Sequence, residues 1–192
     1  MHIGSEFFSD DELKSFNFKS VGKNVKIKKN VGIYFVENVT IGNNVRIDDN
    51  TVIVASNKPV ILGNYVHIAS NCYIAASNGL DMEDFSGLAP GVSIFTGSDD
   101  YSGSKLTNPT VDQKYIGGKS GKVTLGRHVI IGAHSVILPR VQVGEGSSVG
   151  ALSLVTKSLD PWGIFFGSPV KRLKARSKKL LKLEKDFLEE QD

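Results

Sequence analysis

Residues 125–155 read LGRHVIIGAHSVILPRVQVGEGSSVGALSLV, and their pattern decides the fold. A branched aliphatic residue recurs every six positions, and the residue four places after each is mostly small or β-branched. This period fits neither an α-helix, which repeats every 3.6 residues, nor a long two-faced strand, which repeats every two. It is typical of short flat strands that are joined by regular corners. The repeating aliphatic residues are Leu125, Ile131, Ile137, Val143, Val149 and Val155.

The same phase runs through the earlier part of the chain, within residues 21–33, 41–53, 62–74 and 82–94. Three hexads make one triangular coil, and coils should stack about 4.8 Å apart with their aliphatic residues inside. Corners need residues that tolerate a positive φ, which Asn and Gly do best. Such residues stand in the fourth place of many hexads: Asn24, Asn30, Asn44, Asn50, Asn71, Gly91 and Gly146. Core periodicity and corner chemistry agree on a parallel β-helix, whereas a β-sandwich would show irregular spacing.

The repeats are preceded by an N-terminal cap over residues 1–20. Ser9 and Glu12 match a capping box, so a short helix is expected to begin near Asp10 and to cover the open end of the prism. The β-helix itself is expected over residues 21–160.

One long segment interrupts the repeats. The hexads stop after Ile94 and resume at Val123, and residues 97–120 between them are polar and rich in glycine. A long loop that leaves a regular solenoid is commonly functional, so we expect this ejected loop to shape a binding site.

The C-terminal part differs again. Pro161 and Gly163 are expected to end the repeats, which leaves residues 161–192 as a tail. Within that tail, residues 171–190 predict an α-helix, because apolar residues fall on one face. These residues are Leu173, Leu180 and Phe187, with Leu183 and Leu188 nearby.

Composition excludes several classes of protein. The formal charge of +3 over 192 residues is too small to indicate a nucleic-acid partner. No apolar run approaches the roughly 18 residues that a membrane span needs, and the first residues lack the apolar core of a signal peptide. Cys72 alone cannot form an internal disulfide and fits a reducing compartment. We therefore expect a cytoplasmic protein without a membrane span.

Three stretches near the end of the repeats resemble a known family. They are IGAHSVILPRVQVG at 131–144, VGALSLVTK at 149–157 and GSPVKRLK at 167–174. Together with the hexads and the ejected loop, they resemble the left-handed β-helix acyltransferases. The nearest groups are galactoside and maltose O-acetyltransferases, xenobiotic acetyltransferases, and sugar acetyltransferases of O-antigen and capsule pathways.

The resemblance covers about residues 21–173 and implies a fold and an assembly. The fold is all-β, a single-stranded left-handed parallel β-helix with a short N-terminal helix and a C-terminal α-helix. The assembly is a homotrimer with active sites between neighbouring prisms. The implied cosubstrate is acetyl-CoA, bound along the outside of the later coils, and no metal is expected.

The resemblance also carries cofactor-binding positions onto this chain. Two alanines match positions that meet the pantetheine arm, a Thr-Lys pair matches positions near the adenine, and two lysines stand where the family has arginines near the CoA phosphates. Lysine keeps the charge but loses bidentate geometry, and a solvated basic helix face is the alternative for these two residues. The positions are Ala133, Ala151, Thr156, Lys157, Lys171 and Lys174.

The catalytic base departs from the family pattern. Family members usually supply a histidine in the ejected loop, shortly after a Thr-Gly pair, to take the acceptor's proton. Here Thr96 and Gly97 are followed by Ser98, Asp99 and Asp100, and Asp99 stands in the histidine's place. An aspartate is a weaker base unless burial raises its pKa, although it could orient a histidine from elsewhere.

The chain offers four histidines for that role: His2, His67, His128 and His134. We favour His67, expected to face outward at a corner, with Asp99 or Asp100 beside it across the subunit interface. His134 lies next to the expected CoA track and is the second candidate. His128 is expected at a corner, and His2 at the terminus.

The sequence thus predicts an acetyl-CoA-dependent acetyltransferase that acts on a sugar hydroxyl or amino group. Its acceptor would be a nucleotide sugar or a glycan of O-antigen, capsule or lipopolysaccharide biosynthesis. An uncharged amine needs less help from a base, which slightly favours N-acetylation, whereas the nearest sequence pattern suggests O-acetylation, so both reactions stay open. One alternative is a γ-carbonic-anhydrase-like metalloenzyme with zinc on His67, His128 and His134, although the last two lie six residues apart instead of five. The other is a non-catalytic β-helix scaffold.

Overall fold

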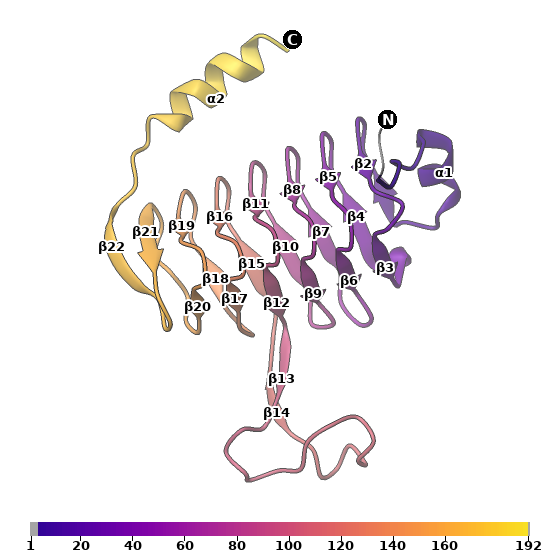
Figure 1. The fold of residues 1–192 in the computed structure, drawn as a ribbon, viewed down its shortest axis with the longest axis vertical. Coiled ribbons are helices and arrows are strands. Elements are labelled where there is room, and N and C mark those ends of the chain that lie inside the picture. The colour runs from indigo at the N-terminus through magenta and orange to yellow at the C-terminus, as the bar shows by residue number, and fades with distance from the viewer. Residues whose placement is uncertain (1–3, 192) are drawn as a thin grey trace.

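The computed structural model describes residues 4–191, and the chain forms a triangular prism of stacked coils (Figure 1). Each side of the prism is a sheet whose strands are parallel, except for the last pair of the second sheet. The first sheet contains β1 (Ser20–Val21), β4 (Val39–Ile41), β7 (Val60–Leu62), β10 (Leu80–Met82), β15 (Val123–Leu125) and β18 (Gln142–Val143). The second contains β2 (Lys26–Ile27), β5 (Arg46–Ile47), β8 (His67–Ile68), β11 (Gly87–Leu88), β16 (Ile130–Ile131), β19 (Ser148–Val149), β21 (Gly163–Phe166) and β22 (Lys171–Ala175). The third contains β3 (Gly32–Tyr34), β6 (Val52–Val54), β9 (Tyr73–Ala75), β12 (Ser93–Phe95), β17 (Val136–Ile137) and β20 (Leu154–Val155).

The predicted aliphatic ladders form the core. On the second sheet, parallel pairing places Ile47 beside Ile68 and Leu88 beside Ile131, and each of these side chains is at most 2% exposed. On the third sheet, Ile74 lies between Ile53 and Ile94 and is completely buried. In each hexad a strand directs its aliphatic residue into the prism, and this accounts for the six-residue period of the sequence.

Corner residues adopt positive φ, as predicted for all but one of the expected positions. Asn24, Asn44, Asn50, Asn71, Gly91 and Gly146 have φ between 54° and 73°, whereas Asn30 is not among them. Bulkier residues take the same conformation at equivalent corners, with φ between 56° and 60° at Tyr65, Phe85, His128, His134, Leu152 and Trp162. This conformation is uncommon for such residues, so the stacking of coils fixes the corners more strongly than local preference does.

The predicted capping box and the short helix near Asp10 are confirmed. Helix α1 (Asp10–Ser15) begins after Ser9, whose hydroxyl accepts a hydrogen bond from the Glu12 backbone N–H at 3.2 Å. The Glu12 carboxylate in turn accepts from the Ser9 N–H at 2.7 Å. Leu13 of this helix is 2% exposed and joins the core, so α1 covers the β2–β3 end of the prism (Figure 1).

The chain leaves the prism where the hexads stop. After β12 the chain leaves the prism as two antiparallel strands, β13 (Gly97–Asp99) and β14 (Gly118–Ser120), and the residues between them form an extended excursion (Figure 1). A 3-10 helix, η1 (Val36–Asn38), makes a smaller irregularity at an earlier corner.

The predicted end of the repeats and the predicted helix over 171–190 need correction. Strand β21 continues the second sheet beyond Pro161, and β22 pairs with it in antiparallel fashion. Helix α2 covers only Leu180–Glu189, and Leu173 is 63% exposed on β22 instead of facing a core. The outer edge of β21 has backbone N–H and C=O groups that no earlier coil pairs with. Residues 171–175 pair with this edge, which stabilises them as strand β22.

Helix α2 folds back over a row of stacked rings at the corners that precede the second sheet. Tyr65 stacks on Phe85 with ring centroids 4.6 Å apart, and Phe85 stacks on His128 at 5.2 Å. Phe187 of α2 meets the edge of this row, 5.4 Å from Tyr65, while Glu184 binds His128 Nε2 at 2.8 Å. Neither α2 nor α1 is long and apolar enough to cross a membrane, and these are the α-helices of residues 4–191.

The burial pattern predicts a large difference between two isoleucines. Ile74→Ala removes a completely buried side chain and should lower the free energy of unfolding by about 2–5 kcal/mol. Ile61→Ala, at a position 41% exposed on the outer side of β7, should change it by about 0.5 kcal/mol. Urea unfolding at one fixed protein concentration measures both values, and equal losses would contradict the assignment of the core.

Candidate active site

A row of functional side chains crosses the outer side of the second sheet. Strand pairing places Lys26 beside Arg46 and Arg46 beside His67 on three successive strands, and Gly87 comes next. All three side chains point outward, because the residues that follow them, Ile27, Ile47 and Ile68, fill the core. His67 was expected at a corner, but it lies on strand β8.

A buried carboxylate fixes two members of this row. Asp48 is 8% exposed, and its two oxygens accept hydrogen bonds from Arg46 Nε and from His67 Nε2, each at 2.8 Å. Burial by itself would raise the pKa of Asp48, but the hydrogen bonds from His67 and Arg46 outweigh burial and hold the pKa below its usual value. Asp48 is therefore an anion, and a neutral His67 that donates from Nε2 keeps Nδ1 as its proton acceptor.

Sequence reasoning missed Asp48. The coils around it are longer than three ideal hexads, since Lys26 pairs with Arg46 twenty residues on and Arg46 with His67 twenty-one residues on. The available signal was the two-residue spacing of Arg46 and Asp48, which places both on one side of a strand.

The two loop aspartates have different surroundings. Asp99 is the last residue of β13 and is exposed where the loop begins. Asp100 accepts hydrogen bonds from the hydroxyls of Ser102 and Ser104 and from the N–H groups of Ser102 and Lys105. These bonds, led by those from Ser102, hold the pKa of Asp100 far below its usual value. Asp100 therefore organises the turn of the loop.

A groove lies between the loop and the third sheet. It has a volume of about 960 Å³. One side consists of loop residues that include Asp99 and Tyr101, and the other consists of apolar side chains of the sheet. Its size and mixed lining suit a small organic ligand. The apolar side is made by Phe95, Val136, Leu138 and Leu154.

The structure separates the predicted catalytic residues within one chain. His67 projects from the second sheet, whereas Asp99 and Asp100 belong to the hairpin that follows the third sheet. His134 is exposed at the corner between these sheets, where its ring lies over Gly91, so close that a Cβ there would be 2.4 Å from Nδ1. His67 and Asp99 therefore lie on different elements of the prism, one on the second sheet and one on the hairpin after the third.

His128 has a structural position. It is 8% exposed, and its Nε2 is hydrogen-bonded to Glu184 of α2. Burial, more than any other influence, lowers the pKa of His128. His67, His128 and His134 thus lie on one sheet and two different corners. Within residues 4–191, no group of three or more His, Cys, Asp or Glu side chains is placed to hold a metal ion. His2 lies outside the described residues.

Two of the predicted cofactor-binding positions lie at the corner between the second and third sheets. Ala133 and Ala151 lie in successive coils, linked by the bond from Leu152 N–H to the Ala133 carbonyl at 2.8 Å. Gly132, just before Ala133, has no room for a side chain, because a Cβ on it would come within 2.4 Å of the Ala151 nitrogen.

The basic members of that set occupy the last coil and its added strand. Thr156 and Lys157 are exposed directly after β20. Lys171 and Lys174 are exposed on β22, where they pair with Phe166 and Ile164. The alternative of a solvated helix face therefore does not apply to these two lysines, since their segment is a strand.

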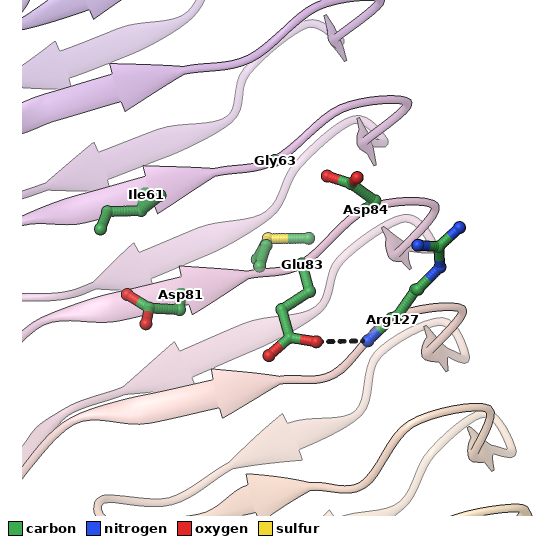
Figure 2. A pocket seen from close by; sticks show the side chains of 7 residues that line it. Ile61, Gly63, Asp81, Glu83, Asp84 and Arg127 are labelled. Carbon is green, nitrogen blue, oxygen red and sulfur yellow. Dashed lines mark hydrogen bonds between the residues drawn. The ribbon is translucent and has the colours of Figure 1, made fainter.

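A second hollow lies on the first sheet, with a volume of about 350 Å³, and Figure 2 shows its acidic lining. Its carboxylates already have protein partners. Asp81 pairs with Lys122, Glu83 accepts from the Arg127 N–H at 3.0 Å, and Asp84 accepts from the Asn64 N–H at 2.7 Å. None of the predicted site residues lines this hollow, so the candidate active site remains on the second and third sheets.

Comparisons with known proteins agree with this architecture. A family described as bacterial transferase hexapeptide (six repeats) matches residues 122–157. The dTDP-4-amino-4,6-dideoxy-D-glucose acyltransferase of Escherichia coli is 40% identical over 181 residues, which is 94% of this chain and 94% of that protein.

Solved structures of AntD, an N-acyltransferase from Bacillus cereus, are similar over nearly the whole chain. The complex of AntD with dTDP and 3-hydroxybutyryl-CoA is 44% identical and has a TM-score of 0.91, with 97% of this chain and 98% of that chain covered. A variant of AntD in complex with dTDP-4-amino-4,6-dideoxyglucose and Coenzyme A is 45% identical, with a TM-score of 0.93 and coverage of 98% and 100%. The chain therefore belongs to the hexapeptide-repeat family of acyltransferases, and it is an enzyme that uses an acyl-CoA.

Proposed function

We propose that this enzyme transfers an acyl group from acyl-CoA to the amino group of a dTDP-linked amino sugar, with dTDP-4-amino-4,6-dideoxyglucose as the first acceptor to test. The observation that carries the proposal is identity of 40–45% over nearly the full chain with two proteins named for this chemistry. The loop supports it, because Asp99 stands where a stronger base would be needed for a hydroxyl. Acetyl-CoA and 3-hydroxybutyryl-CoA are the two donors to compare.

The reaction forms one C–N bond and breaks one C–S bond. The uncharged amine attacks the thioester carbonyl, the tetrahedral intermediate collapses, and CoA leaves as a thiolate. The amine must lose one proton, and the thiolate gains one. We propose that His67 Nδ1 or Asp99 receives the proton, with Asp48 stabilising the imidazolium that forms on His67. His134, beside the cofactor track, is the alternative acceptor of the proton.

The cofactor is proposed to approach from the later coils. Ala133 and Ala151 would leave room for the pantetheine arm, and Thr156 and Lys157 would contact the adenine end. Lys171 and Lys174 would contact phosphates as single charges.

We further propose a homotrimer, on the evidence of the outer side of the third sheet. The outer side of this sheet is apolar, as its core side is. Tyr34 is 57% exposed and Tyr73 is 45% exposed, and the same sheet contains Val52, Phe95 and Leu154. Such a patch commonly marks an interface. The fitting occupant is a second copy, because His67 of one chain then has a means of meeting Asp99 of another. We also propose a cytoplasmic enzyme that serves surface polysaccharide or lipopolysaccharide assembly.

The test of the proposed function is a transfer assay. The enzyme is mixed with dTDP-4-amino-4,6-dideoxyglucose and each acyl-CoA, the released CoA thiol is followed, and the product mass is determined. We expect one acyl group on each amino sugar. Acylation of maltose or a galactoside, with no acylation of the nucleotide sugar, would overturn the proposal in favour of O-acetylation.

If Asp99 takes the proton, Asp99→Asn should lower kcat by about 100-fold or more, because the amide cannot accept the proton. The KM for acyl-CoA should stay nearly constant. Asp112→Asn, at another exposed aspartate of the same loop, is the matched control and should keep full activity. Equal activity of the two variants would remove Asp99 from the mechanism.

His67→Ala should likewise lower kcat by about 100-fold if His67 takes the proton, whereas His134→Ala should change it little. Steady-state rates at saturating concentrations of both substrates separate the two histidines. Turnover equal to wild type in His67→Ala would exclude the role of His67, and a loss confined to His134→Ala would transfer the role to that residue.

Tyr73→Asp should break the trimer into smaller species, because it places a charge in the centre of the apolar interface. Ile61→Asp introduces the same charge at a similarly exposed position of the first sheet and should leave the trimer intact. Sedimentation velocity measures both masses. A trimer that survives Tyr73→Asp would place the interface elsewhere.

A further inference from the structure

The start of the second sheet carries positive charge that the catalytic chemistry does not use. Lys26 and Arg46 occupy the row that leads to His67. Lys28 lies half-buried just after β2, where its Nζ donates to the Ser5 carbonyl. Asp48 is the acidic side chain bonded within this group, and it is buried beneath the others. Within the row itself, the charges that face solvent are therefore those of Lys26 and Arg46, which are exposed.

The Arg46 side chain is held in a fixed orientation. Asp48 binds only its Nε, so the two terminal amino groups remain directed away from the carboxylate, and the side chain stays 54% exposed. The Phe7 ring lies 5.5 Å from the guanidinium and 4.3 Å from Lys28 Nζ, which restrains both cations from one side. A guanidinium fork that is fixed and still exposed suits a phosphate group.

The residue that follows His67 in the row has no side chain. After His67 comes Gly87, where a Cβ would meet no atom closer than 3.4 Å, so packing does not require glycine at this position. Ala69 and Ala89, two residues after His67 and Gly87 along the chain, have short side chains as well. Beyond His67 in the row, no bulky side chain therefore stands until Ile130, which pairs with Gly87 on the next strand.

We propose that Lys26 and Arg46 bind the diphosphate of the nucleotide-sugar acceptor, with Asp48 as the positioning residue for Arg46. The proposal rests on the proposed function and specifies where its acceptor binds. Adjacent strands are about 4.8 Å apart, so a diphosphate over Lys26 and Arg46 places the attached sugar one strand further, over His67 and Gly87. Acceptor and acyl-CoA then enter from opposite ends of one sheet, and the amine meets the thioester between them.

The experiment compares dTDP and CoA binding by calorimetry in wild type, Lys26→Ala and Arg46→Ala. Each alanine variant should weaken dTDP binding by about 10- to 100-fold, since each loses a charged hydrogen bond to phosphate. CoA binding should remain within about two-fold of wild type. Arg46→Lys should restore part of the dTDP affinity, because the charge returns without the fork. Lys58→Ala, which removes an exposed cation outside the row, is the matched control.

Kinetics give a second readout that does not depend on calorimetry. Arg46→Ala should raise the KM for the nucleotide sugar and largely keep kcat, and Gly87→Val should raise the same KM by filling the sugar space. Unchanged dTDP affinity and unchanged KM in Lys26→Ala and Arg46→Ala, in an enzyme that still acylates the nucleotide sugar, would overturn this inference and leave the proposed function standing. A wild-type enzyme that binds no dTDP would overturn both.

Discussion

The register between successive coils is the constraint on which the rest of the structure depends. Each strand donates and accepts backbone hydrogen bonds with the coil before and after it, as in Lys26 N–H to Val45 carbonyl at 2.8 Å and Arg46 N–H to Val66 carbonyl at 3.0 Å. Because side chains alternate between the two sides of a strand, a shift of one residue would exchange core and surface. The same register that buries Ile47 and Ile68 brings Arg46 and His67 side by side above Asp48.

The parts of the fold that a local pattern encodes could be predicted from the sequence. The hexads gave the core, the capping box gave α1, and the missing hexads gave the ejected loop. Strand β22 could not be predicted, because its partner is the sheet edge that the preceding coils create. The Asp48–His67 pair was hidden for a related reason: unequal coils of twenty and twenty-one residues obscure which positions stack.

The three aspartates of the candidate site lie in different environments. Asp48 is buried and holds two neighbours in place, Asp100 is bonded to the turn of its own loop, and Asp99 is exposed and available. The sequence pattern places Asp99 in the position of the family histidine, but it does not show what surrounds either aspartate. The hydrogen bonds from Ser102 and Ser104 make the distinction, and they depend on how the loop folds.

Helix α2 changes how the solenoid responds to stress. In a simple stack each repeat contacts only its neighbours, so the ends can fray while the middle stays folded. Phe187 and Glu184 reach Tyr65 and His128, which belong to coils separated by the one that carries Phe85. The last segment of the chain thereby ties together coils that do not touch one another, and unravelling from the C-terminal end must break these contacts before the central coils can open. Cooperativity in this linear fold thus comes from a side-mounted helix as well as from the stack.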